Sequence, residues 1–102
     1  MKANEFVKKY GLELSREIVS KQPKWASNVR VSEIIGTWEY TEKVLPSFSI
    51  VELKGLVESH ELVGRYGTAD EAKEYLPMLR MDSYDELKQA IADVESCMEV
   101  NQ

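Results

Sequence analysis

The spacing of apolar residues predicts a long helix in the middle of the chain. Ser49 and Glu52 are spaced as in a capping box, in which each side chain accepts a hydrogen bond from the other residue's main-chain N–H. Apolar or aromatic positions and one histidine then recur at steps of three and four, at Leu53, Leu56, Val57, His60, Val63 and Tyr66. Gly67 is predicted to be the left-handed residue that ends this helix.

Two further helices are predicted towards the C-terminus. Residues 68–71 and 83–86 repeat the capping-box pattern. The helix that follows Thr68 should end or kink near Leu76, because Pro77 lacks an N–H and clashes with the preceding turn. The last helix has an apolar stripe at Leu87, Ala90, Ile91, Val94, Cys97 and Met98.

The N-terminal part is predicted to be helical and broken at Gly11. Its apolar face contains Phe6, Val7, Tyr10, Leu14 and Ile18. An interior glycine costs a helix about 1 kcal/mol. The sequence around Tyr10-Gly11 resembles that around Tyr66-Gly67, with a one-residue gap, which favours a helix, a stop and a short second helix in both places. Pro23 is predicted to end this part.

Residues 24–47 allow two interpretations. Val29 and Val31 alternate before Gly36, and Trp38 and Tyr40 alternate after it, which predicts a β-hairpin. The alternative is a loop with one irregular helical turn, held by Trp25 and Trp38. In both interpretations the segment ends at Pro46. The predicted fold is therefore mainly α, a single small domain over 1–102 with about four or five short helices.

Composition indicates a folded protein in a reducing compartment. Of the 102 residues, 43% are hydrophobic and 30% are charged, which is too apolar for a disordered chain. There is no apolar run long enough to cross a membrane and no pattern of a secretion signal. The single cysteine excludes an intrachain disulfide and a cysteine-rich zinc site. We expect no cofactor, no metal and a cytoplasmic location.

Charge is unevenly distributed along the chain. Residues 1–30 have a net charge of +4 and residues 31–102 a net charge of −9, with six acids and one lysine between Asp82 and Glu99. The acidic face of this last helix is either simply solvated or a docking surface for a basic protein. The aromatic residues of the middle segment, 24–47, either belong to the hydrophobic core or form a second contact surface. The candidate partner-binding residues are Trp38, Tyr40, Asp85, Glu86, Asp93 and Glu95.

The basic N-terminal part suggests nucleic-acid binding as an alternative. Its cations are Lys8, Lys9, Arg16, Lys21, Lys24 and Arg30, with Trp25 nearby. A helix-turn-helix around Gly67 is disfavoured, because its second helix would carry Asp70, Glu71 and Glu74 against a single lysine, Lys73.

Catalysis is not expected. His60 is the only histidine and Cys97 the only thiol. A nucleophilic dyad would need the fold to bring them together. Both lie on apolar helix faces, where packing roles are the simpler interpretation.

Three stretches resemble one group of proteins. They are LKGLVESHELV at 53–63 with Tyr66-Gly67, LKQAIADVE at 87–95, and the opening from Phe6-Val7 to Tyr10-Gly11. They are similar to small uncharacterised proteins of temperate lambda-like bacteriophages and their prophages. The resemblance implies a phage or prophage accessory protein that is made in the cytoplasm of a bacterial cell, and it implies no particular functional residues. We therefore expect a non-enzymatic protein-binding module that acts on a host or phage protein, with a nucleic-acid-binding regulator as the alternative. The oligomeric state stays open.

Overall fold

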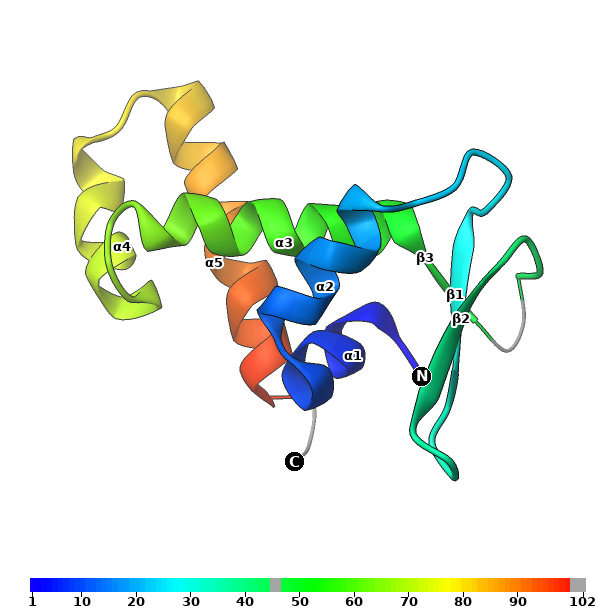
Figure 1. Cartoon of the computed structure of the whole chain (residues 1–102). Helices are drawn as coiled ribbons and strands as arrows, with labels where there is room; N and C mark the ends of the chain where they lie inside the picture. Colours follow the sequence, from blue (N-terminus) through cyan, green and yellow to red (C-terminus); the bar gives the residue numbers. More distant parts are fainter. Residues whose placement is uncertain (45–46, 100–102) are drawn as a thin grey trace.

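A computed structural model describes residues 1–44 and 47–99, and it shows a helical body with a small antiparallel sheet at one end (Figure 1). This confirms the mainly α fold. The elements are α1 (Ala3–Tyr10), α2 (Leu12–Ser20), β1 (Asn28–Ser32), β2 (Thr37–Thr41), β3 (Phe48–Ser49), α3 (Ile50–Gly64), α4 (Ala69–Tyr75), the short 3-10 helix η1 (Leu76–Met78) and α5 (Met81–Glu99). No helix within these described ranges is long and apolar enough to span a bilayer.

The predicted break at Gly11 is confirmed. Gly11 has φ 95° and ψ 162°, a conformation that is nearly restricted to glycine, and it separates α1 from α2. Its N–H still closes α1 by donating to the Val7 carbonyl oxygen over 3.0 Å. The chain therefore changes direction between two short helices, and both pack against α3.

The hairpin interpretation of the middle segment is also confirmed. β1 pairs with β2 in antiparallel register, with Val29 opposite Tyr40 and Val31 opposite Trp38. Gly36 has φ 70° in the connecting turn. β3 pairs with the other side of β1, which the sequence did not predict, and the strand order is β2-β1-β3. The predicted closure at Pro46 lies outside the described residues.

Helix α3 begins where the sequence predicted and ends one residue earlier than predicted, with Arg65 in place of Tyr66 as its C-cap. The Ser49 hydroxyl accepts from the N–H groups of Val51 and Glu52, at 3.1 and 3.4 Å. The Glu52 side chain accepts no bond from the Ser49 N–H, so only half of the predicted capping box forms. Gly67 has the positive φ that was predicted for it, but it lies two residues after the C-cap and not directly after it. The N–H groups of the two residues after Gly64 turn back to carbonyl oxygens three residues earlier, a tight turn that precedes Gly67 at φ 110°.

Helix α4 confirms the second capping box. Thr68 and Glu71 accept reciprocally from each other's main-chain N–H, at 3.2 and 3.1 Å. The helix ends at Tyr75, and Pro77 lies in η1, as its missing N–H predicts.

The third predicted capping box, at residues 83–86, does not begin a helix. Helix α5 begins at Met81, so Ser83 lies inside its first turn and does not cap it. The chain is extended at Leu79, and the Tyr84 N–H donates to the Arg80 carbonyl oxygen over 2.7 Å. Main-chain bonding thus starts the helix two residues before the serine.

Two hydrophobic clusters stabilise the molecule. The first lies between α1, α2, the sheet and the first half of α3, and it includes Phe6, Ile18, Val29, Phe48, Leu53 and Cys97. The second lies between the end of α3, α4 and α5, and it includes Val63, Ala72, Leu87, Ala90, Ile91 and Val94. Helices α3 and α5 contribute to both. The sheet and α4 therefore lie at opposite ends of α3, in a molecule with extents of 45 × 31 × 20 Å (Figure 1).

Candidate functional site

Two of the four predicted partner-binding acids are engaged within the fold. The Asp93 carboxylate accepts from the Ser59 hydroxyl of α3 at 2.6 Å and from the Gln89 side-chain amide at 3.1 Å. The Glu95 carboxylate pairs with the Lys73 ammonium of α4 at 2.7 Å. Both acids are half-buried. They join α5 to its two neighbours on different sides of the helix, so they do not form one docking face.

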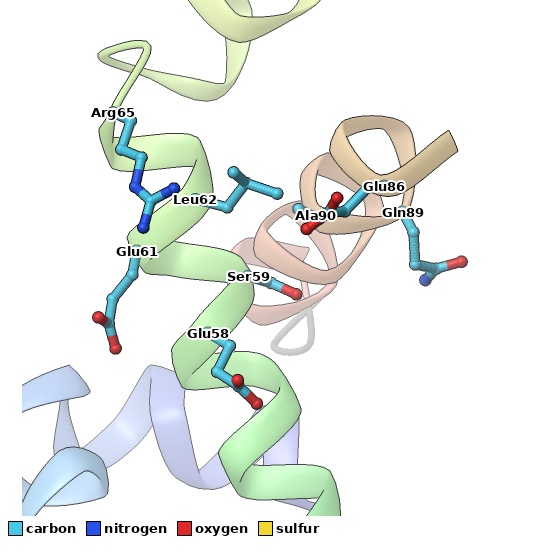
Figure 2. A pocket seen from close by; sticks show the side chains of 8 residues that line it. All are labelled: Glu58, Ser59, Glu61, Leu62, Arg65, Glu86, Gln89 and Ala90. Carbon is cyan, nitrogen blue, oxygen red and sulfur yellow. The ribbon is translucent and has the colours of Figure 1, made fainter. Parts of the chain in front are cut away.

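The other two acids, Asp85 and Glu86, are exposed. Glu86 lines a hollow of about 420 Å³ between α3 and α5, together with Glu58, Glu61 and Arg65. Figure 2 shows Leu62 of α3 pointing across this hollow towards α5, with the carboxylates around it. The hollow is open and acidic, and within the described residues no buried unpaired polar atom points to a ligand there.

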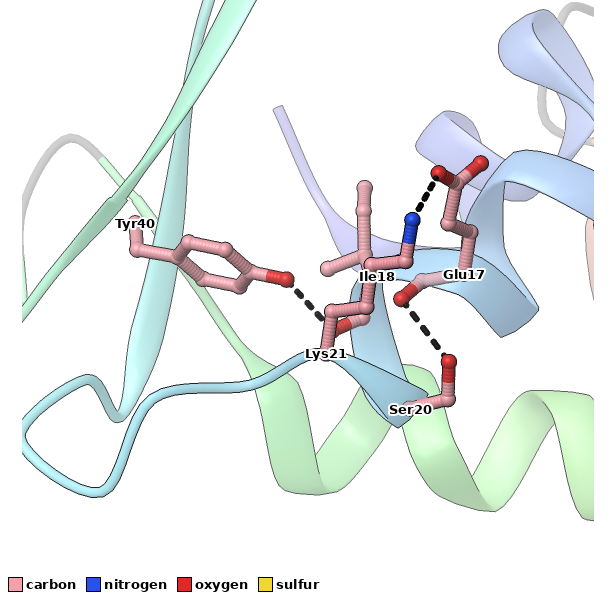
Figure 3. A network of polar contacts seen from close by, with 5 residues as sticks. All are labelled: Glu17, Ile18, Ser20, Lys21 and Tyr40. Atoms are coloured by element: carbon pink, nitrogen blue, oxygen red, sulfur yellow. Dashed lines mark hydrogen bonds and ion pairs between the residues drawn. The ribbon is translucent and has the colours of Figure 1, made fainter.

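Trp38 and Tyr40 connect the hairpin to the helical body. Both side chains are half-buried and pack against the first cluster, and their rings meet edge to face at 5.1 Å. The Tyr40 hydroxyl donates to the Ile18 carbonyl oxygen of α2 over 2.7 Å, next to the Lys21–Glu17 ion pair at 2.8 Å (Figure 3). Burial raises the pKa of the Tyr40 hydroxyl above its ordinary value of 10.0. These two aromatic residues thus anchor the hairpin.

The exposed apolar residues of the hairpin lie at its tip. Ile34 and Ile35, in the turn between β1 and β2, are 97% and 72% exposed. Beside them, β2 is an edge strand, paired only with β1 in the described part of the sheet. Two adjacent isoleucines before Gly36 are visible in the sequence as a signal for this surface. Their exposure could not be predicted from it, because exposure depends on the orientation of the hairpin relative to the helical body.

The structure does not bring His60 and Cys97 into a catalytic arrangement. The His60 Nδ1 atom lies 2.8 Å from the Leu56 carbonyl oxygen of its own helix. Cys97 is buried in the first cluster, and burial is the main cause that raises the pKa of its thiol. No hydrogen bond links the two side chains, and no group of three metal-ligating residues occurs within 1–44 and 47–99.

The predicted nucleic-acid surface is divided by local partners. Arg16 pairs with Glu61 at 3.9 Å, and Arg30 pairs with Glu39 across the hairpin. The Lys8 ammonium donates to the Met98 carbonyl oxygen over 2.6 Å. The Lys9 ammonium lies over the Tyr10 ring, 5.6 Å from its centroid. With the Lys21 ion pair, three of the six predicted cations are paired with carboxylates, which weakens their field towards a phosphate backbone.

Comparison with known proteins finds no matching family, no matching curated protein and no matching solved structure. The function is therefore argued from this chain's own surfaces.

Proposed function

We propose that the protein is a protein-binding module and that its contact surface is the β-hairpin, with the tip residues Ile34 and Ile35 and the open edge of β2. The observation that supports this is the exposure of both isoleucines, 97% and 72%, at the end of a well-anchored hairpin. Two adjacent, almost fully solvated aliphatic side chains contribute little to the fold. An exposed apolar patch of this kind is typical of interaction sites.

The anchoring of the hairpin supports the proposal further. Trp38 and Tyr40 fix β2 against the body, so the tip is presented in one orientation. A surface that is ordered before binding loses less conformational entropy when a partner docks. The same two residues were predicted to contact a partner, and in this proposal they position the contact surface instead.

The open edge of β2 indicates what kind of partner segment would bind there. An edge strand presents unpaired main-chain groups that accept an extended segment of another protein. Glu33 and Glu42 are exposed beyond the two ends of β2, and neither has an ion-pair partner in the described residues. The proposed partner is therefore a protein with an extended segment that carries apolar and basic residues. A second copy of this chain, with its net charge of −5, is a poorer fit.

The phage-like sequence stretches suggest where to look for this partner. In a bacterial cell that carries a temperate phage, the partner would be a host or phage protein. The module itself needs no catalytic group for this role, because occupying an edge or a surface is sufficient to block or redirect another protein.

An affinity experiment tests the proposal. The double variant Ile34→Asp/Ile35→Asp is compared with the wild-type protein and with Val51→Asp, a control of similar exposure, 77%, at the start of α3. Each tagged protein is used to capture partners from nuclease-treated bacterial lysate, with quantitative mass spectrometry. We expect at least one partner that wild type and Val51→Asp retain and that the double variant loses by about tenfold, with an unchanged unfolding midpoint.

The location of the contact is then checked with that partner. Its minimal binding segment should shift the amide NMR signals of 37–41 and slow their hydrogen exchange, because new strand hydrogen bonds protect them. Retention of every partner by the double variant would overturn the proposal. So would capture that disappears with nuclease treatment, or a homodimer that the double variant abolishes.

A further inference from the structure

The main-chain bonds of the sheet determine which groups of β2 face its open edge. In an antiparallel pair, opposed residues alternate between positions that exchange main-chain hydrogen bonds and positions that do not. The Ile50 N–H donates to the Ser27 carbonyl oxygen over 2.9 Å, one step before β1 begins and on its β3 side. The main-chain groups of Asn28 therefore point the other way, towards β2, where Asn28 lies opposite Thr41. The Thr41 carbonyl oxygen accepts from the Ser27 N–H at 3.3 Å, which agrees with this direction.

Trp38 and Tyr40 present their main-chain groups to the open edge. Because the direction alternates along a strand, Thr37 and Glu39 point towards β1 as Thr41 does. The N–H and carbonyl groups of Trp38 and Tyr40 then point away from β1, and the described residues form no further strand on that side. Antiparallel pairing is slightly more stable per residue than parallel pairing. A strand added antiparallel at this edge would therefore bond to these two residues.

The same two residues determine which side chains an added strand needs. Directly opposed residues of an antiparallel pair project their side chains from the same face of the sheet. The rings of Trp38 and Tyr40 face the helical body and are only half-buried, so residues opposite them would cover the remaining ring surface. Aromatic and β-branched side chains form favourable pairs with aromatic rings in this position. An added strand should therefore carry two apolar residues separated by one residue.

The residue between these two lies on the outer face of the sheet. The side chains of Thr37, Glu39 and Thr41 project there, and Glu39 is the charged one among them. The Glu39 side chain is still 55% exposed although it pairs with Arg30. A hollow of about 420 Å³ extends along this face from these two residues to Ile35 at the hairpin tip. It leaves room for a basic side chain opposite Glu39, where an opposite charge is favourable and a like charge is not.

We propose that the partner of the hairpin binds through an antiparallel strand with the pattern apolar–basic–apolar. The apolar residues lie opposite Tyr40 and Trp38, and the basic residue lies opposite Glu39. This inference rests on the proposed function, and it names the segment that the open edge of β2 accepts. The main-chain groups of the two apolar residues bond to β2, and those of the basic residue point away from it. Main-chain bonds thus provide affinity, and the alternation of side chains provides specificity.

Capped five-residue peptides test the pattern without a captured partner. The matching peptide is Thr-Ile-Lys-Ile-Thr. The control Ile-Thr-Lys-Thr-Ile has the same composition and charge, but its isoleucines are too far apart to lie opposite both rings. Each is titrated into the ¹⁵N-labelled full chain and followed by two-dimensional NMR. We expect the matching peptide to shift the amide signals of 37–41 saturably, with a Kd on the order of 1 mM, and the control to bind at least about fivefold more weakly.

Methylation of peptide nitrogens tests the direction of the main-chain bonds. N-methylation of both isoleucines removes the donors that β2 needs, so saturable binding should disappear. N-methylation of the lysine is the matched control and should change the Kd by less than about twofold, because its N–H points away from β2. Hydrogen exchange gives a second readout. With the matching peptide at five times its Kd, exchange of the Trp38 and Tyr40 N–H groups should slow about sixfold, whereas that of Glu39, already bonded to β1, should change little.

A charge swap tests the central position. The double variant Arg30→Glu/Glu39→Lys keeps opposite charges across the hairpin, so its unfolding midpoint should stay close to that of wild type. It should bind Thr-Ile-Glu-Ile-Thr about two- to fivefold more tightly than the lysine peptide, and wild type should have the reverse preference. Glu39→Gln should bind the two peptides equally, and it provides the comparison if the double variant does not fold.

Four results would overturn the proposal. They are the absence of saturable shifts with the matching peptide, equal binding of the control peptide, equal effects of the two N-methylations, and an unchanged preference for lysine in the folded Glu39 variants. Any of these, together with loss of a captured partner by the Ile34→Asp/Ile35→Asp variant, would place the contact at the hairpin tip alone. The failure of this inference is thereby distinguished from the failure of the proposed function, in which that variant retains every partner.

Discussion

Tyr40 of β2 donates its phenolic hydrogen to the main-chain carbonyl oxygen of Ile18 in α2, over 2.7 Å. The contact joins residues 22 positions apart and links the hairpin to the end of a helix that is itself buried against the body. It satisfies one of the carbonyl oxygens that a helix leaves unpaired in its last turn. The same hydrogen bond therefore helps to hold the hairpin and pairs a carbonyl oxygen at the end of α2.

Replacing Tyr40 with phenylalanine should lower the free energy of unfolding by about 1 kcal/mol, because the ring stays and one half-buried hydrogen bond is lost. Chemical denaturation measures this. Tyr66→Phe is the control: the Tyr66 ring packs on Tyr75 at 5.1 Å, and its hydroxyl makes no hydrogen bond to any described residue. Equal losses in the two variants would contradict the role of the Tyr40 hydroxyl.

The pH dependence gives the same prediction a second readout. Burial raises the pKa of folded Tyr40 above 10.0, so the unfolded chain loses this proton first. The contribution of Tyr40 is fully present below pH 10 and is lost as the pH rises from there through the raised pKa. Between pH 9 and 11, wild type should therefore lose more stability than Tyr40→Phe does.

Thr68 and Ser83, the first residues of two of the three capping-box sequences, should respond differently to substitution by alanine. Thr68→Ala removes a side chain that accepts from the Glu71 N–H, and it should cost about 1 kcal/mol of unfolding free energy. Ser83→Ala should cost almost nothing, because Ser83 is exposed inside the first turn of α5 and caps no helix. Thermal or chemical denaturation of both variants measures the difference. A large loss for Ser83→Ala would place the start of α5 at the serine after all.

The thiol of Cys97 should react slowly in the folded protein. It is buried, and burial raises its pKa, so little thiolate is present or accessible at neutral pH. Labelling with an aromatic disulfide at pH 7 should be at least about tenfold slower than in denaturant. His60→Gln should leave this rate unchanged once differences in stability are taken into account. Fast labelling that depends on His60 would restore the dyad hypothesis.

Local signals predicted the helices well, and non-local contacts explain where prediction failed. Gly11, Ser49, Thr68 and Pro77 act on their own neighbours along the chain, so their effects were readable from sequence. The strand β3 was not, because two residues show no periodicity and pair with β1 only after the chain has returned to it. Ser83 was misleading, since main-chain bonding from Arg80 starts α5 before the serine.

The candidate surfaces were harder to predict than the helices. Residue type identified Trp38 and Tyr40 as candidates, but their sides of the strand face the body. Asp93 and Glu95 looked equivalent in an acidic helix, and only packing shows that one bonds to α3 and the other to α4.

The residues that hold the hairpin against the body and the residues at its tip occupy different positions along the hairpin. This separation affects how the sequence can vary. Val29, Val31, Trp38 and Tyr40 contact the body, so substitutions there change whether the hairpin is held. Ile34 and Ile35 belong to neither hydrophobic cluster, so they can be exchanged for other residues without loss of the core. Descendants of this sequence can therefore diverge rapidly at the tip while inheriting the same scaffold.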